Sequence, residues 1–343
     1  MTKDEKSIAI IACDHGYGHV RRCLIIASKL ADLNWQVNLF APAGAVRKLA
    51  SSIDIDTQIL LSDFSIGTRI DQLCRGTVDN WIKRLPSMDE FALVLSDNLL
   101  DILKIRPDAT LSGSFLWHRA LDCFDTGLYA EAESLLEHYS PKMIGSSLFA
   151  ADELREITEF YPVGLFVSQS PDYNDRQGSD LLITCGMSGE IESEYSAFIK
   201  QLVLDEKPPF NTVWVEPRLW PAGAPVWMKA ATFDADMYKS LGAAICRPGV
   251  GTLTDCLWGG ARVFCYFEAG NREMVENIRA LNKAGVGESF STLIDAYYSA
   301  VGYWQTRSAK TKHLESLKKI NFDGATETSV ILEEIIAYRT NSF

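Results

Sequence analysis

Several features that mark metal-binding, secreted or membrane-spanning proteins are missing from this chain of 343 residues. Its eight cysteines are scattered, with no Cys-x-x-Cys pair and no Cys/His cluster, so the sequence predicts reduced, mostly buried thiols and no metal site. No apolar run reaches transmembrane length, and the charged N-terminus leads into an apolar run too short for a signal peptide. We therefore expect a cytoplasmic protein without a transmembrane segment. The aromatic residues near 297–304 leave peripheral membrane contact open.

Basic clusters are also missing. Asp and Glu number 45 against 33 Lys and Arg, which gives a net charge of −12, and no segment concentrates the positive residues. This charge pattern argues against nucleic acid as a partner. Apolar residues make up 47% of the chain and charged residues 23%, as is typical of a soluble globular protein with room for two domains.

Short apolar runs alternate with segments of helical periodicity, which predicts an α/β fold of two doubly wound, Rossmann-like parallel sheets. We expect an N-terminal domain over residues 1–162, a Pro-, Gly- and Asp-containing linker over 163–178, and a C-terminal domain over 179–343. The last helix, near 327–338, could pack back on the N-terminal domain. In such a fold, ligands bind beyond the carboxyl ends of the strands, here in a cleft between the domains. Strands are expected at 7–12, 36–40, 57–61, 91–96, 110–114, 142–145, 180–185, 211–215, 226–229, 243–246 and 262–266, and the longer helices at 19–33, 118–138, 192–204, 251–258 and 273–284.

The turn after residues 243–246 has the composition of an anion site. Gly249 and Gly251 allow close backbone approach, and Val250 and Thr252 belong to the first helical turn, whose N–H groups lack intrahelical partners. Arg247 adds a positive charge beside them. The competing interpretation is a buried strand–helix turn whose glycines serve only packing.

A second glycine turn follows the first expected strand, with His15 and His19 on either side of a Gly-Tyr-Gly sequence. His19 falls at the start of a helix on the carboxyl edge of the sheet, where a neutral imidazole can act as a general base. A capping or core histidine is the alternative. Asp97 ends another apolar strand at the same edge and could orient His19, or it could simply cap the next helix.

Three further residues follow strand ends. Trp117 could stack on a sugar ring with His118 beside it to bind an acceptor, although Trp117, with Phe115 and Leu116, could equally pack the following helix. Phe233 follows the strand expected at 226–229 and is a candidate for stacking on a nucleotide base.

These features together resemble the two-domain GT-B glycosyltransferases. The Gly-Tyr-Gly-His19-x-x-Arg22 stretch is similar to the N-terminal loop of that superfamily, above all to the version in the UDP-sugar hydrolase of pseudaminic acid biosynthesis, whose histidine is catalytic. Residues 247–255 and 273–278 resemble the donor-binding region of the peptidoglycan N-acetylglucosaminyl transferase and the plant and antibiotic-tailoring enzymes. Residues 186–189 match the loop that opens the second domain.

The resemblance implies roles for individual residues. Asp255 would hold the ribose hydroxyls and Glu273 the donor sugar, with Gly186 and Ser188 also near the donor. Met274 departs from the glutamine of many transferases. The acceptor side would include His15, Tyr17, Arg22, Trp117 and His118.

The resulting expectation is an inverting glycosyltransferase that moves a sugar from a nucleotide-diphosphate sugar, UDP-linked, to a hydroxyl of a carbohydrate or small-molecule acceptor in glycan biosynthesis. His19 is the expected base, and neither a metal nor a cofactor is required. A nucleotide-sugar hydrolase in which His19 activates water is the nearest alternative. A sugar-nucleotide 2-epimerase and a non-catalytic nucleotide-sugar-binding protein are the others.

Overall fold

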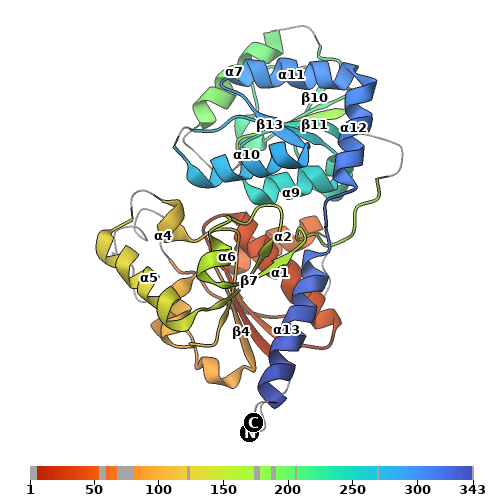
Figure 1. Ribbon diagram of the computed structural model, residues 1–343. Helices are drawn as coiled ribbons and strands as arrows, with labels where there is room; N and C mark the ends of the chain where they lie inside the picture. The colour runs from red at the N-terminus through yellow and green to blue at the C-terminus, as the bar shows by residue number, and fades with distance from the viewer. Residues whose placement is uncertain are drawn as a thin grey trace. The chain divides into compact units, whose positions relative to one another are not determined.

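The computed structural model describes residues 6–53, 59–67, 81–121, 124–173, 178–186, 191–204, 207–268 and 270–341. The chain divides into two compact units, each built on one parallel sheet (Figure 1). Unit 1 comprises Met1–Ser168 and Asp323–Phe343, and unit 2 comprises Gln169–Phe322. Unit 1 therefore contains both the first strand and the last helix.

Unit 1 has seven strands in the order β3-β2-β1-β4-β5-β6-β7. Apolar runs form its centre: Ile8, Ile10 and Ile11 of β1 are fully buried, as expected for a parallel strand covered on both faces. Side chains alternate between the faces, so that Ile10 packs toward one helical layer and Ile11 toward the other. The strands are β1 (Ser7–Ile11), β2 (Gln36–Ala41), β3 (Leu60–Asp63), β4 (Leu93–Asp97), β5 (Thr110–Ser112), β6 (Lys142–Ser146) and β7 (Glu159–Val163).

Helices cover both faces of this sheet. On one face lie α1 (Tyr17–Asp32), α2 (Ala43–Ile53) and α13 (Gly324–Asn341), the last of which packs against α1 (Figure 1). The other face is covered by η1 (Trp81–Arg84), η2 (Met88–Glu90), η3 (Leu100–Lys104), α5 (Thr126–Tyr139) and α6 (Leu154–Ile157), with the short α4 (Trp117–Ala120) before α5.

Unit 2 has six strands in the order β10-β9-β8-β11-β12-β13. One face packs against α7 (Glu192–Leu204) and α11 (Leu293–Gln305), and α9 (Val250–Trp258) and α10 (Arg272–Ala284) contact β11–β13 on the opposite side (Figure 1). The remaining elements are β8 (Asp180–Thr184), β9 (Val213–Val215), η4 (Pro217–Leu219), β10 (Met228–Ala230), α8 (Ala235–Ser240), β11 (Leu241–Cys246), β12 (Arg262–Cys265), β13 (Gly287–Ser289) and α12 (Arg307–Leu317).

The predicted fold class is confirmed, and two elements of unit 1 differ from the expected ones. The helix expected at 118–138 is divided into α4 and α5. Strand β7 was not expected: it lies just before the segment interpreted as a linker and overlaps it only at Val163. Its Pro162 is tolerated because β7 is an edge strand. The six described cysteines are free and buried, whereas Cys74 and Cys123 lie outside the described residues.

Candidate active site

His19 lies in the first turn of α1, directly after the turn that leaves β1. The N-cap residue Gly16 has φ +92°, a left-handed conformation that glycine adopts without strain, and no side chain caps the helix. This sharp turn starts α1 at the carboxyl edge of the sheet, so His19 is held on a rigid element next to the end of β4.

Asp97 is the residue that pairs with His19. It ends β4, is fully buried, and its Oδ2 lies 3.0 Å from His19 Nδ1. The turn that carries Asp97 is fixed by its neighbours: Asn98 N–H donates to Ser112 O over 2.9 Å. A Cβ on Gly113 would lie only 1.5 Å from the side-chain amide of Asn98, so a larger residue there would displace that amide. The main alternative for Asp97, a helix cap, is not what its side chain does.

The second oxygen of Asp97 is also occupied. Arg22 Nη2 donates to Oδ1 in a buried ion pair, and Ser112 Oγ donates to the same oxygen over 3.4 Å. Arg22 Nη2 also lies 3.4 Å from His19 Nδ1. Because the carboxylate is nearest to Nδ1, we assign a proton to Nδ1, so that Nε2 is the nitrogen left to accept a proton from a substrate.

The charges in this cluster are coupled. Burial alone would raise the pKa of Asp97, but the attraction of Arg22 and His19 outweighs it and holds that pKa below its usual value. Burial would lower the pKa of Arg22, but the neighbouring Asp97 raises it by more, so that this pKa lies above its usual value. Burial, with Asp97 nearby, raises the pKa values of Cys13 and Cys23, so both are neutral thiols.

Aromatic rings surround the imidazole of His19. The ring of Trp117 lies 5.5 Å from that of His19 and 5.8 Å from that of His15, centroid to centroid. Phe115 meets Trp117 edge-to-face at 4.8 Å. Three predicted residues from two segments, His15, His19 and Trp117, therefore lie together.

The other two predicted acceptor residues have different surroundings. Tyr17 packs toward α2, with Lys48 Nζ 4.7 Å from its ring. His118 is buried with Nε2 2.8 Å from Glu133 Oε1 on α5. Burial lowers the pKa of His118, against the opposing effect of Glu133. The observed partner of His118 is thus Glu133 on α5, and its role in acceptor binding stays a prediction.

In unit 2, the predicted phosphate turn joins β11 to α9. Gly249 is the N-cap of α9 with φ −74°, no side chain caps this helix, and a Cβ on Gly249 would meet nothing within 4 Å. Gly249 N–H itself donates to Arg247 O over 2.9 Å. Val250, Gly251 and Thr252 form the first turn of α9, where the backbone N–H groups have no intrahelical acceptors. The groups on which the predicted anion site depends are therefore at the start of α9, and anion binding there stays a prediction.

Arg247 is bound to a residue that the sequence interpretation missed. Its Nε lies 3.0 and 2.9 Å from the two carboxylate oxygens of Glu268, and Asn271 Nδ2 donates to Glu268 Oε1 over 3.1 Å. Burial would raise the pKa of Glu268, but Arg247 lowers it overall. Asn277 is also buried and donates to Pro248 O over 2.8 Å, which anchors the turn on α10.

The remaining donor candidates occupy three places in unit 2. Asp255 is half-buried on α9, and Glu273 is half-buried in the first turn of α10. Phe233 has φ +56° between β10 and α8, with its ring 6.4 Å from Tyr238. Met274 is buried, so its departure from glutamine places an apolar side chain in the core.

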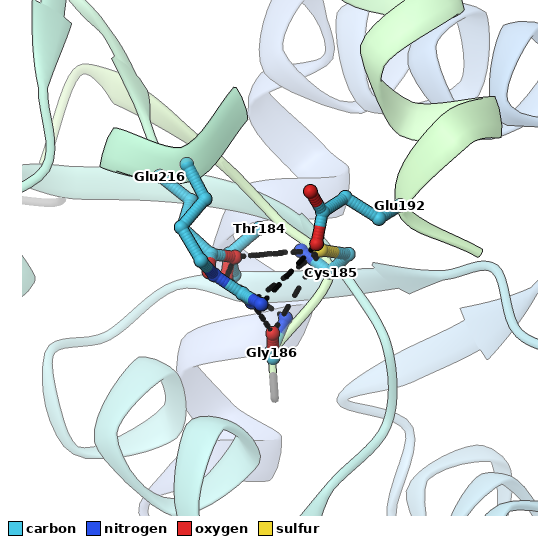
Figure 2. Close-up of polar contacts among 6 residues, drawn as sticks. Thr184, Cys185, Gly186, Glu192 and Glu216 are labelled. Carbon is cyan, nitrogen blue, oxygen red and sulfur yellow. Dashed lines mark hydrogen bonds and ion pairs between the residues drawn. The ribbon is translucent and has the colours of Figure 1, made fainter. Parts of the chain in front are cut away.

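Gly186 lies at the end of β8 within a polar cluster (Figure 2). Glu216 is buried at the end of β9, where it accepts from Thr184 Oγ1 over 2.7 Å and from Cys185 N–H over 3.1 Å. Arg218 donates from Nε to Glu216 over 2.8 Å and from Nη2 to Gly186 O. Ser188, the other residue predicted in this loop, lies outside the described residues.

Glu216, Arg218 and Glu268 were missed because they lie in loops or in the very short η4, which have no recognisable pattern. Their only sequence signal is position, since each comes within a few residues of a strand's carboxyl end. Across the described part of the chain, no group of three or more His, Cys, Asp or Glu could hold a metal ion. Among the described helices, none is both long and apolar enough to span a membrane.

No protein-family model and no curated protein matches this chain. Solved structures do match over nearly its whole length. Spinosyn rhamnosyltransferase SpnG is 14% identical, with a TM-score of 0.62 and coverage of 96% of this chain and 100% of its own. LpCGTa in complex with UDP is 14% identical, with a TM-score of 0.65 and coverage of 95% and 98%. Arabidopsis thaliana UGT89C1 complexed with quercetin is 12% identical, with a TM-score of 0.62 and coverage of 97% and 98%. These likenesses establish the fold: the chain has the GT-B fold of glycosyltransferases.

Proposed function

We propose that the protein is an inverting glycosyltransferase that moves a sugar from a nucleotide-diphosphate sugar, UDP-linked, to a hydroxyl group of an acceptor. The observation that carries the proposal is the His19–Asp97 pair at the carboxyl edge of unit 1, in a fold shared with glycosyltransferases. A histidine whose Nδ1 is held by a carboxylate is prepared to accept a proton at Nε2.

Unit 2 would bind the donor. The diphosphate would lie against the first-turn N–H groups of α9, where the helix dipole favours negative charge and stabilises the leaving group. Asp255 would bind the ribose and Glu273 the sugar, as the resemblance of residues 247–278 implies. The proposal therefore assigns stabilisation of the leaving diphosphate to backbone groups and requires no metal ion.

Unit 1 would supply the base. His19 Nε2 takes the proton of the acceptor hydroxyl as its oxygen forms a bond to the anomeric carbon. The bond from that carbon to the diphosphate oxygen breaks, so the configuration inverts and the nucleoside diphosphate leaves with the bonding electrons. Trp117, beside His19, would pack against the acceptor.

The first experiment is an HPLC assay of the purified protein against UDP-, dTDP-, GDP- and CMP-sugars without acceptor. Binding of one donor with slow cleavage supports a transferase. Rapid release of free sugar from one donor would instead establish the hydrolase, in which His19 activates water. His19→Ala should reduce turnover by about 10²–10⁴-fold while leaving UDP affinity unchanged. Equal loss of both would refute the assignment of His19 as base.

A further inference from the structure

The guanidinium of Arg22 is largely buried and bonded to Asp97, unlike that of a residue that binds an acceptor from solvent. Arg22 lies one helical turn after His19 on α1, its side chain is 11% exposed, and its Nη2 is bonded to Asp97 Oδ1. Asp97 thus has a base on one oxygen and a permanent cation on the other. The same guanidinium nitrogen is within 3.4 Å of His19 Nδ1, so its charge also acts directly on the imidazole.

An unneutralised carboxylate in this position would move the proposed chemistry to higher pH. A buried negative charge 3.0 Å from an imidazole favours its protonated form, and an imidazolium cannot accept a proton from an acceptor hydroxyl. Arg22 cancels that charge while leaving the Asp97 oxygen free to hold Nδ1. The Asp97–Arg22 pair therefore orients His19 without placing a net negative charge beside it.

Other ionisable groups near His19 do not replace Arg22. Cys13, at the end of β1, and Cys23, on α1, are neutral thiols. His15 has Nδ1 3.7 Å from Asp14 Oδ1, and Asp14 also accepts from Ser65 and Gly67. Arg22 is the cation that bonds directly to Asp97 in the described part of the chain.

We propose that Arg22 is a positioning residue that neutralises Asp97, so that Asp97 can fix the orientation of His19 without holding a proton on it. This inference rests on the proposed role of His19 as a base. It changes the expected role of Arg22 from binding the acceptor to setting the pH range in which the enzyme works.

The test is the pH profile of kcat/KM for Arg22→Met. Loss of the cation should move the acid limb of the profile upward by about one pH unit, the lower end of the usual effect of a neighbouring charge. Arg22→Lys keeps the charge and should keep the acid limb within about 0.3 unit of the wild type, even if the rate falls. Arg21→Met is the matched control, because Arg21 is adjacent on α1 and donates to Phe166 O instead; its profile should not move.

NMR titration of the His19 imidazole compares the wild type with Arg22→Met and does not depend on measuring activity. Its midpoint should rise in Arg22→Met. If that variant does not fold, Arg22→Gln is measured instead, because it removes the charge and keeps a hydrogen-bond donor. Its midpoint should also lie about one unit above that of the wild type. Coincident midpoints would overturn the proposal. Failure of the proposed function is a separate result, because it appears as retained turnover in His19→Ala.

Discussion

His19 Nδ1 and Asp97 Oδ2 lie 3.0 Å apart, although 78 positions separate them in the sequence. The contact joins the start of α1 to the end of β4, two elements that meet because β1 and β4 are neighbouring parallel strands. The carboxylate is buried and the imidazole side chain is 13% exposed.

Asp97→Asn keeps the shape of the side chain and removes its charge. We expect kcat to fall by about 10²–10⁴-fold with little change in the KM for donor, because the amide can hold His19 in the wrong tautomer. Steady-state kinetics with a saturating acceptor measures this. Asp101→Asn, at an exposed ion pair with Lys104 on η3, is the control and should behave as wild type. An effect confined to KM would show that Asp97 binds substrate rather than orienting the base.

Gly249→Ala tests whether the start of α9 receives the diphosphate. The backbone there has φ −74°, and a Cβ meets nothing within 4 Å, so the substitution should leave the free energy of unfolding within about 1 kcal/mol of wild type. The added methyl group would nevertheless occupy the approach to the N–H groups, and we expect UDP to bind about tenfold more weakly, or ~1.4 kcal/mol. Calorimetric titration with UDP measures this.

The control for that experiment is Gly302→Ala, an exposed position on α11 where a Cβ also meets nothing. This variant should be stabilised by about 0.5–1 kcal/mol, because alanine loses less backbone entropy in a helix. Its UDP affinity should not change. Wild-type UDP affinity in Gly249→Ala would place the diphosphate elsewhere.

Variants of the Arg247–Glu268 pair separate two roles for Arg247. If its charge assists the diphosphate, Arg247→Met should weaken UDP binding about fivefold, close to 1 kcal/mol, whereas Glu268→Gln should maintain or increase affinity because a nearby negative charge is removed. If the pair only shapes the turn, both variants should weaken binding alike. The comparison requires UDP titrations at low and high salt, since a charge effect is screened.

The buried His313 should make the free energy of unfolding fall as the pH is lowered. Burial, with Arg262 nearby, lowers its pKa to about 3, and its Nε2 lies 3.2 Å from Gly260 O. The unfolded chain binds the proton near pH 6.5 and the native state does not, so this residue's contribution is complete above that pH and declines as pH falls toward 3. The expected slope is about 1.4 kcal/mol per pH unit.

Urea unfolding between pH 7 and pH 4 checks this slope. His313→Gln should flatten it, whereas His138→Gln, at an exposed site at the end of α5, should not. If the wild type and His313→Gln lost stability in parallel, His313 would not be the source of the acid sensitivity.

The pairing of His19 with Asp97 was predictable because the carboxyl ends of parallel strands share one edge of a sheet. Arg22 was predictable as a neighbour of His19, since residues three apart share a helix face. Its bond to Asp97 was not, because the same spacing also allows it to point toward solvent. The choice depends on a buried carboxylate that needs a second partner, which is a tertiary property.

Elements without periodicity limited the prediction elsewhere. Strand β13 spans only Gly287–Ser289 and β7 contains Pro162, so neither shows the apolar run that revealed β1 or β11. Glu268 lies in the loop after β12, and only the folded chain shows that it meets Arg247. The sequence therefore predicted the sites where a strand ends in a glycine turn. It did not predict contacts that a loop makes with a distant part of the chain, such as that of Glu268 with Arg247.

Because α13 belongs to unit 1, that unit depends on the order in which the ribosome releases the chain. Residues 169–322 emerge as one uninterrupted segment and can fold as they appear, while unit 1 waits for the final helix. Until then, the apolar surface beside α1 that Leu332 and Ile335 cover remains exposed, and Lys6 lacks its partner Glu333. A chain cut short before α13 would thus carry an open core on the unit that holds His19. Unit 1 is complete only once residues 324–341 have been made.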